Sequence, residues 1–325
     1  MDSVKHLLEV KDLEVTFALR TGNLTAIDGV SFSLDRGERV GIVGESGAGK
    51  SVTGFAIINL ISKPGYISGG HVYFNGQDLT GFADENMRHI RGNRISMVFQ
   101  DPMMTLNPVL SIGTQMVETL QAHQKISRQA AEEICLDKLR KVYIPAPEQR
   151  LKQYPHEFSG GMRQRIVIAI ALLTNPDIII ADEPTTALDV TIQAEIMELL
   201  LELCESEKMG LILITHDLAV VSQVTRKIVV MYAGKIVEMG PTMDVISNPL
   251  HPYTKGLISA LPESCTRGER LNQIPGMMPT LTSIPKGCAF HPRCSIRSAQ
   301  CKETVPLLIS VGDMDRMVAC HILVE

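Results

Sequence analysis

The feature that most constrains the fold is a glycine-rich segment placed directly after a short apolar strand. The strand-like residues 39–43 run into GESGAGKS, residues 44–51, which fits the pattern Gly-x4-Gly-Lys-Ser and precedes a helix-compatible stretch. Glycines let backbone N–H groups curl around an anion, and the following helix N-terminus adds partial positive charge. The segment predicts a phosphate-binding loop. The simpler alternative is a glycine-rich turn between strand and helix.

All residues of this loop, and the one after it, are candidate nucleotide ligands: Gly44, Glu45, Ser46, Gly47, Ala48, Gly49, Lys50, Ser51 and Val52. Lys50 is expected to reach the β- and γ-phosphates of a nucleotide, and the Ser51 hydroxyl is expected to coordinate Mg²⁺. The loop therefore predicts a nucleotide with its magnesium ion as the ligand.

A second candidate site follows an apolar stretch that ends in two acids. Residues 177–184 read DIIIADEP, so a buried strand would place Asp182 and Glu183 at the carboxyl edge of a sheet, where α/β folds bind ligands. Asp182 is expected to hold Mg²⁺ through water, and Glu183 to polarise the water that attacks a phosphate. Without the phosphate loop, a solvated acidic strand end would be the preferred interpretation.

A third segment, FSGGMRQR at residues 158–165, opens a helix with serine and glycine. Ser159, Gly160 and Gly161 would form a second anion-binding helix terminus. One nucleotide rarely needs two cradles from the same chain, so this one is expected to serve a nucleotide held by a neighbouring subunit. Considered alone, an ordinary N-cap at Ser159 is the simpler interpretation.

Hydrophobic periodicity predicts an α/β fold. Strand-like alternation dominates the first hundred residues, and helical spacing follows. Apolar strands return at residues 178–181, 211–215 and 228–237, and the dipeptides at 75–76 and 233–234 signal hairpins. Strands that alternate with helices predict a mostly parallel core, here with a β-rich front and a helical insertion.

The C-terminal segment, residues 248–325, differs in composition from the rest. It holds 5 of the 7 cysteines, 8 of the 17 prolines, and 8 basic against 6 acidic side chains; the first 247 residues carry 23 basic and 30 acidic ones. The acidic main body gives no broad electrostatic footprint for nucleic acid. Because the start shows no secretion signal, the cysteines suggest free thiols or a metal site rather than disulfides.

The chain is not expected to cross a membrane itself. Its longest unbroken apolar run, residues 166–173, has 8 residues. A membrane-spanning helix needs roughly 20.

Six motifs in one order resemble the ATPase subunits of ABC transporters. GESGAGKS is followed by VFQDP, FSGGMRQR, IIIADEP, TALD and ITHD, and the resemblance covers about residues 7–247. It implies the P-loop NTPase fold of an ABC cassette over residues 1–247, with a mixed β core, a β-rich front subdomain and a helical subdomain at about 101–170. Phe158 and Met162 depart from the family's usual leucine and glutamine, but neither is expected to meet phosphate.

The resemblance assigns roles to residues that carry little signal alone. It implies that Phe17 stacks on adenine, that Gln100 links Mg²⁺ to the helical subdomain, and that His216 contacts the γ-phosphate. Glu183 and His216 are then the catalytic residues. On pattern alone, Phe17 is a core residue of an alternating strand and His216 a structural turn histidine.

The C-terminal segment resembles the extension of the dipeptide, oligopeptide and nickel importer branch, and we expect it to form a separate module over residues 248–325. Four thiolates can hold a tetrahedral zinc ion or an iron–sulfur cluster. By the resemblance, a [4Fe-4S] cluster is expected on the cysteines spaced x5, x6 and x18 apart, namely Cys288, Cys294, Cys301 and Cys320. Zinc and four buried free thiols remain the alternatives.

The resemblance implies an ATP-hydrolysing subunit of a peptide importer at the cytoplasmic face of the membrane. Its expected partners are two transmembrane permease subunits, a second and homologous ATPase, and an extracytoplasmic peptide-binding protein, with no nucleic acid. Nickel or another small solute as cargo is one alternative. A soluble ABC-type ATPase acting on nucleic acid is the alternative from another class.

Overall fold

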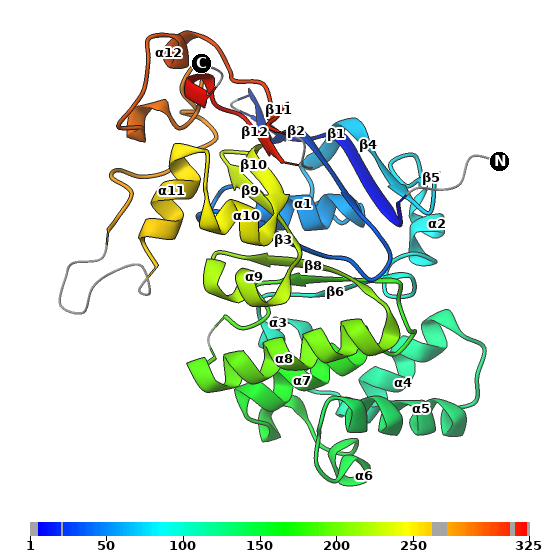
Figure 1. Ribbon diagram of the computed structural model, residues 1–325. Coiled ribbons are helices and arrows are strands. Elements are labelled where there is room, and N and C mark those ends of the chain that lie inside the picture. Colours follow the sequence, from blue (N-terminus) through cyan, green and yellow to red (C-terminus); the bar gives the residue numbers. More distant parts are fainter. Residues whose placement is uncertain (1–5, 21, 187, 262–271, 313–315, 324–325) are drawn as a thin grey trace. The chain divides into compact units, whose positions relative to one another are not determined.

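The computed structural model describes residues 6–20, 22–186, 188–261, 272–312 and 316–323, and the chain packs as two compact units (Figure 1). The first unit joins residues 1–81 to 213–325, and the second comprises residues 82–212. The predicted helical subdomain at 101–170 lies within the second unit. The predicted boundary at residue 247 stays a prediction, because the C-terminal segment packs in the same unit as the N-terminus.

The first unit begins with an antiparallel sheet in the order β2-β1-β4-β5. Alternation of apolar side chains predicted these strands, and the buried positions of the long strands follow it. Asn75 and Gly76 have φ values of 48° and 78°, as a tight hairpin requires. The strand bounds are β1 Leu8–Leu19, β2 Gly22–Leu34, β4 Gly65–Phe74 and β5 Gln77–Asp78.

The same unit carries five strands of a mixed sheet in the order β11-β12-β10-β9-β3. β3 (Arg39–Val43) runs parallel to β9 (Lys227–Tyr232), which forms a hairpin with β10 (Lys235–Pro241). β12 (Met317–Val318) adds antiparallel to β10, and β11 (Ile309–Ser310) pairs with β12. The C-terminal segment therefore extends a sheet that begins beside the phosphate loop.

The helices of this unit are short: α1 Lys50–Ile57, α9 Leu218–Val224, α10 Thr242–Ser247, α11 Pro252–Ser259 and α12 Gln300–Glu303, with the 3-10 turns η3 His291–Arg293 and η4 His321–Leu323.

A buried ion pair connects the C-terminal segment to the sheet. Arg316 Nη2 donates to Glu238 Oε1 at 2.7 Å, and the carboxylate of Glu238 also accepts from the backbone N–H groups of Leu250 and His251. Because the side chain of Glu238 is fully buried, these partners are needed to offset its desolvation.

The second unit is mostly helical. Its helices are α2 Asp84–Arg88, α3 Pro102–Thr105, α4 Ile112–His123, α5 Arg128–Lys141, α6 Pro147–Arg150, α7 Gly160–Ala171 and α8 Val190–Glu207, with the 3-10 turn η1 Pro155–Glu157. Serines 111, 127 and 159 cap α4, α5 and α7 through their hydroxyl oxygens. β6 (Ile95–Val98) pairs in parallel with β7 (Ile178–Asp182). β8 (Gly210–Thr215) crosses the boundary between the units.

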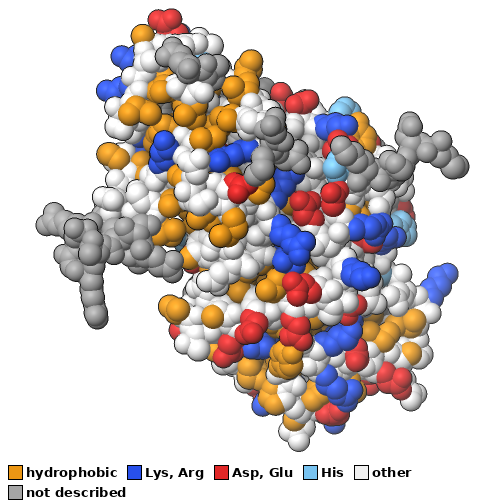
Figure 2. Space-filling view, in the orientation of Figure 1, with side chains coloured by type: hydrophobic (Ala, Val, Ile, Leu, Met, Phe, Trp, Pro, Cys, Tyr) orange, Lys and Arg blue, Asp and Glu red, His pale blue; other side chains and the backbone are white. Residues whose placement is uncertain are grey.

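No helix within the described residues is long and apolar enough to cross a membrane. On the face drawn in Figure 2, apolar side chains gather over the C-terminal segment of the first unit, whereas both signs of charge are interspersed over the second unit.

Candidate functional site

The phosphate loop connects β3 to α1. At two of its positions, only glycine fits the backbone conformation and the space available. All five residues of β3 are buried, so the strand fixes where the loop starts. Gly44 has a φ of 155°, and a Cβ there would lie 2.3 Å from the carbonyl oxygen of Met231. Gly49 has a φ of 101°, and a Cβ there would lie 3.1 Å from the carbonyl oxygen of Ala26. At Gly44 and Gly49 the loop therefore lies too close to the neighbouring backbone for a side chain to fit.

The side chain of Lys50 folds back onto the start of the phosphate loop. The residue is 5% exposed, and its Nζ donates to the carbonyl oxygens of Gly44 at 2.8 Å and Glu45 at 3.0 Å. Helix α1 starts at Lys50, and no side chain caps its N-terminus at Gly49. A cation and a helix N-terminus without a side-chain cap, both within one curled loop, fit the triphosphate of a nucleotide.

The other residues of the predicted loop fall into two groups. Ala48 is buried, and its carbonyl oxygen accepts from Gly234 N at 2.9 Å, which ties the loop to the β9–β10 hairpin. The remaining ones are exposed or half-exposed and accessible to a ligand: Glu45, Ser46, Gly47, Ser51 and Val52.

Phe17 lies on β1 with its ring against β4. A Cβ at Gly65 would lie 2.7 Å from the Cε1 atom of Phe17, so glycine is needed for the ring to lie there. The ring is half-buried rather than in the core. A supported but accessible aromatic face suits stacking on a base.

In the second unit, the structure brings Gln100 and Glu183 together. Gln100 Nε2 donates to Glu183 Oε2 at 3.0 Å, and Thr186 Oγ1 donates to the same oxygen at 2.9 Å. Glu183 has a φ of 43°, an unfavourable conformation for a non-glycine residue and one that tends to cluster at functional sites. Asp182 ends β7 and is 3% exposed. Both acids lie at the carboxyl end of a buried strand, as the sequence predicted.

The serine–glycine segment opens α7 as predicted. Ser159 caps the helix by accepting from Met162 N at 3.4 Å, and Ser159 and Gly160 are exposed. A Cβ at Gly161 would lie 2.7 Å from Ile192 Cγ2 of α8, so a side chain there would push the two helices apart. Phe158, which departs from the family pattern, is 3% exposed and fills an apolar position.

His216 follows β8 in the first unit and is exposed. The next residue, Asp217, caps α9 by accepting from Ala219 N at 2.9 Å. The predicted site residues are therefore divided between the units. Phe17, the phosphate loop and His216 belong to the first unit, and Gln100, Asp182, Glu183 and the serine–glycine segment belong to the second.

The prediction of an iron–sulfur cluster is wrong. Cys288, Cys294, Cys301 and Cys320 are free thiols, and three of them are buried. Within the described part of the chain, which contains all four, no group of three or more His, Cys, Asp or Glu side chains is arranged to hold a metal ion. The same finding gives no support to zinc, and the alternative of buried free thiols fits three of the four, because Cys288 is half-buried. Cys265 lies outside the described residues.

Burial explains these thiols without a metal. Burial, with smaller contributions from the neighbouring thiols, raises the pKa of Cys288 to about 11, so this thiol is protonated at neutral pH. Burial likewise raises the pKa of Cys320. Protonated cysteines pack as small apolar side chains, whereas metal ligation requires thiolates. The resemblance implied that the four cysteines share a cluster, but the sequence carried no information on the orientation of the sulfur atoms.

Alkylation of Cys288 tests this assignment. Because only the thiolate reacts and its pKa is raised, the rate with iodoacetamide is expected to rise about tenfold per pH unit from pH 7 to 10 without levelling. Mass spectrometry of the Cys288 peptide at each pH measures the rate, with free cysteine as the reference. A plateau reached by about pH 9 would show an ordinary thiol pKa and contradict the assignment.

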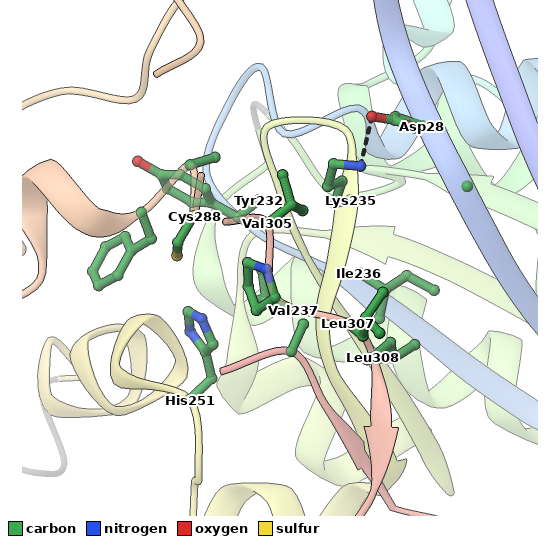
Figure 3. A pocket seen from close by; sticks show the side chains of 15 residues that line it. Asp28, Tyr232, Lys235, Ile236, Val237, His251, Cys288, Val305, Leu307 and Leu308 are labelled. Atoms are coloured by element: carbon green, nitrogen blue, oxygen red, sulfur yellow. Dashed lines mark ion pairs between the residues drawn. The ribbon is translucent and has the colours of Figure 1, made fainter. Parts of the chain in front are cut away.

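A pocket that no sequence pattern indicated lies in the first unit beside the β9–β10 hairpin (Figure 3). Its lining includes Tyr232 and Val237 of the hairpin and Leu307 of the C-terminal segment, with Lys235 Nζ and Asp28 Oδ2 paired at 2.5 Å. None of the described phosphate-loop residues lines it. Its walls come from distant parts of the chain, so no local pattern could have indicated it.

Two family descriptions match the chain. Residues 27–186 match "ABC transporter", and residues 237–301 match "Oligopeptide/dipeptide transporter, C-terminal region". The first match contains the phosphate loop, Asp182 at the end of β7, and Glu183. The second contains three of the four cysteines of the C-terminal segment.

Curated relatives match over nearly the whole chain. The oligopeptide transport ATP-binding protein OppD of Bacillus subtilis is 50% identical over 96% of this chain and 88% of its own length. The dipeptide transport ATP-binding protein DppD of Escherichia coli is 46% identical over 97% of this chain and 96% of its own.

A solved structure of MJ0796, described as a dimeric bacterial ABC transporter cassette, is 28% identical with a TM-score of 0.65; the match covers 72% of this chain and 98% of that one. The fold is therefore that of an ABC cassette, as the motifs predicted. With phosphate loop, acidic strand end and serine–glycine helix in their expected places, the chain belongs to the ABC transporter ATP-binding proteins that carry the oligopeptide/dipeptide transporter C-terminal region.

Proposed function

We propose that this chain is the ATP-binding and ATP-hydrolysing subunit of an importer for dipeptides and oligopeptides, held at the cytoplasmic face of the membrane. One observation carries the proposal: a phosphate loop with the geometry described above and a C-terminal segment of the oligopeptide/dipeptide type occur in one chain. The two relatives are an oligopeptide and a dipeptide transport ATP-binding protein, which supports the same cargo.

In this proposal the first unit binds the nucleotide. The N–H groups of the loop and of the α1 N-terminus hold the phosphates, and Lys50 turns from the loop carbonyls towards the β- and γ-phosphates. Phe17 stacks on the adenine. Its ring can lie where it does because Gly65 has no side chain. His216, exposed after β8, contacts the γ-phosphate.

Hydrolysis needs Glu183 as the base that orients and deprotonates the attacking water. The hydrogen bonds from Gln100 and Thr186 hold its carboxylate in one orientation. Ser51 and Gln100 would supply oxygen ligands of the kind that Mg²⁺ prefers, and Asp182 would hold the ion through water. When bound, the ion would neutralise charge that develops on the phosphates.

Two ATPase subunits complete each site in this proposal. Ser159, Gly160 and Gly161 of one subunit would meet the nucleotide bound to the phosphate loop of the other, because their helix terminus is exposed rather than buried. The second subunit is a homologous ATPase. Two transmembrane permeases and an external peptide-binding protein complete the importer.

Purification of the tagged chain from solubilised membranes tests this assembly. We expect two strongly hydrophobic permeases and a second ATPase in stoichiometric amounts. If the chain comes instead with nucleic acid and no membrane protein, it is a soluble ATPase of the other class. If the external partner of the recovered permeases binds nickel chelates and no peptide, the peptide assignment fails.

A further inference from the structure

The phosphate loop is held from outside by the C-terminal segment. Arg293 Nη1 donates to Glu45 Oε2 at 2.6 Å, and Arg293 Nη2 donates to Glu45 Oε1 at 2.9 Å. The two residues are 248 positions apart and both belong to the first unit. This is the bidentate geometry in which arginine binds a carboxylate most strongly.

The guanidinium of Arg293 is fixed on its other sides as well. Its Nε donates to the carbonyl oxygen of Pro275 at 2.9 Å, and Nη2 donates to that of Ile274 at 3.3 Å. Its carbon Cζ lies 5.9 Å from the ring centroids of both Tyr232 and Phe290. Only 6% of the side chain is exposed, so Arg293 offers Glu45 a rigid partner.

A tyrosine of the same segment holds the backbone of Glu45. The N–H of Glu45 donates to the hydroxyl oxygen of Tyr253 at 2.8 Å. The Tyr253 ring packs against Tyr232 and Phe290, with centroids 4.7 and 5.4 Å away. Both the main chain and the side chain of Glu45 are therefore set by residues outside the phosphate loop.

The carboxylate of Glu45 is a charge of the wrong sign for this loop. A triphosphate carries several negative charges, and Glu45 belongs to the segment that would wrap around it. The side chain of Glu45 is 31% exposed, so solvent alone does not screen it fully. Pairing with Arg293 cancels the charge and turns both carboxylate oxygens towards the C-terminal segment.

We propose that Arg293 is a positioning residue of the ATP site, which neutralises and orients Glu45 so that the phosphate loop accepts a triphosphate. The inference rests on the proposed function, because it concerns the ATP site of the same subunit. It gives the C-terminal segment a role in nucleotide affinity. A purely structural role, in which Arg293 only anchors the segment, predicts a loss of stability with no dependence of ATP affinity on the charge of Glu45.

The test is a charge cycle on the full-length protein, with the affinity for a fluorescent Mg-ATP analogue as the readout. Arg293→Gln is expected to weaken binding about tenfold, which corresponds to roughly 1.4 kcal/mol. Glu45→Gln alone is expected to tighten it about threefold, because the cation of Arg293 remains. The double variant is expected to return to within about twofold of the parent, because no charge is left unpaired.

Arg297→Gln is the matched control. Arg297 lies in the same segment and donates to the carbonyl oxygen of Cys294, so the variant removes the same charge without touching Glu45. Its affinity for the analogue is expected to match the parent's. Thermal unfolding of each variant separates loss of fold from loss of binding.

Three results would overturn the inference: parental affinity in a folded Arg293→Gln, a double variant as weak as Arg293→Gln, or weaker binding by Glu45→Gln. The affinity of Glu45→Gln still tests the inference if Arg293→Gln does not fold. Failure of the proposed function looks different, because the parent protein would then not bind the analogue at all.

Discussion

Glu183→Gln is expected to leave ATP binding within about twofold of the parent and to reduce turnover by roughly two to four orders of magnitude. Glutamine keeps the size of the side chain and still offers an oxygen to Gln100 and Thr186, which now donate to the carboxylate at 3.0 and 2.9 Å. It cannot take a proton from water. Steady-state ATPase assays on the assembled transporter and equilibrium binding of Mg-ATP measure the two effects separately.

Glu195→Gln provides the control for this substitution. Glu195 belongs to the same unit and pairs with Arg165 at 2.9 Å on the surface, so the change removes an equal charge away from the strand end. We expect normal turnover. Near-normal ATPase activity in Glu183→Gln would mean that another group acts as the base.

The second large effect is expected from Lys50→Ala, which should weaken Mg-ATP binding by at least about a hundredfold. The substitution removes the cation expected at the β- and γ-phosphates and both hydrogen bonds that Lys50 makes to the loop carbonyls of Gly44 and Glu45. Isothermal titration with Mg-ATP measures the loss.

Lys235→Ala is the matched variant for Lys50→Ala. Lys235 is a lysine of the same unit, half-exposed and paired with Asp28, so its loss changes net charge without touching the loop. Unchanged affinity is expected. If both lysine variants bind equally well, the nucleotide does not lie in the loop between β3 and α1.

Local sequence patterns predicted the parts of the fold that local physics determines. The turn dipeptide Asn75-Gly76 and the Ala233-Gly234 pair both adopt positive φ at their hairpins. The apolar strand before Glu183 is fully buried and ends where expected.

Contacts between distant segments could not be predicted in this way. The ion pair joins Arg293, the neighbour of Cys294, to Glu45 of the glycine-rich phosphate loop. Neither the cysteine spacing nor the glycine pattern indicates this contact. The error on the four cysteines came from the resemblance to the importer branch, which implied the cluster. A metal site needs sulfur atoms that converge, and the sequence carries no information on their orientation.

Uptake by the reconstituted transporter tests the central claim most directly. The chain, its permeases, the partner ATPase and a peptide-loaded external binding protein would be placed in proteoliposomes with ATP. We predict ATP-dependent accumulation of labelled peptide that is lost when this chain carries Glu183→Gln. Accumulation of a nickel chelate without peptide uptake, or peptide uptake that persists with that substitution, would contradict it.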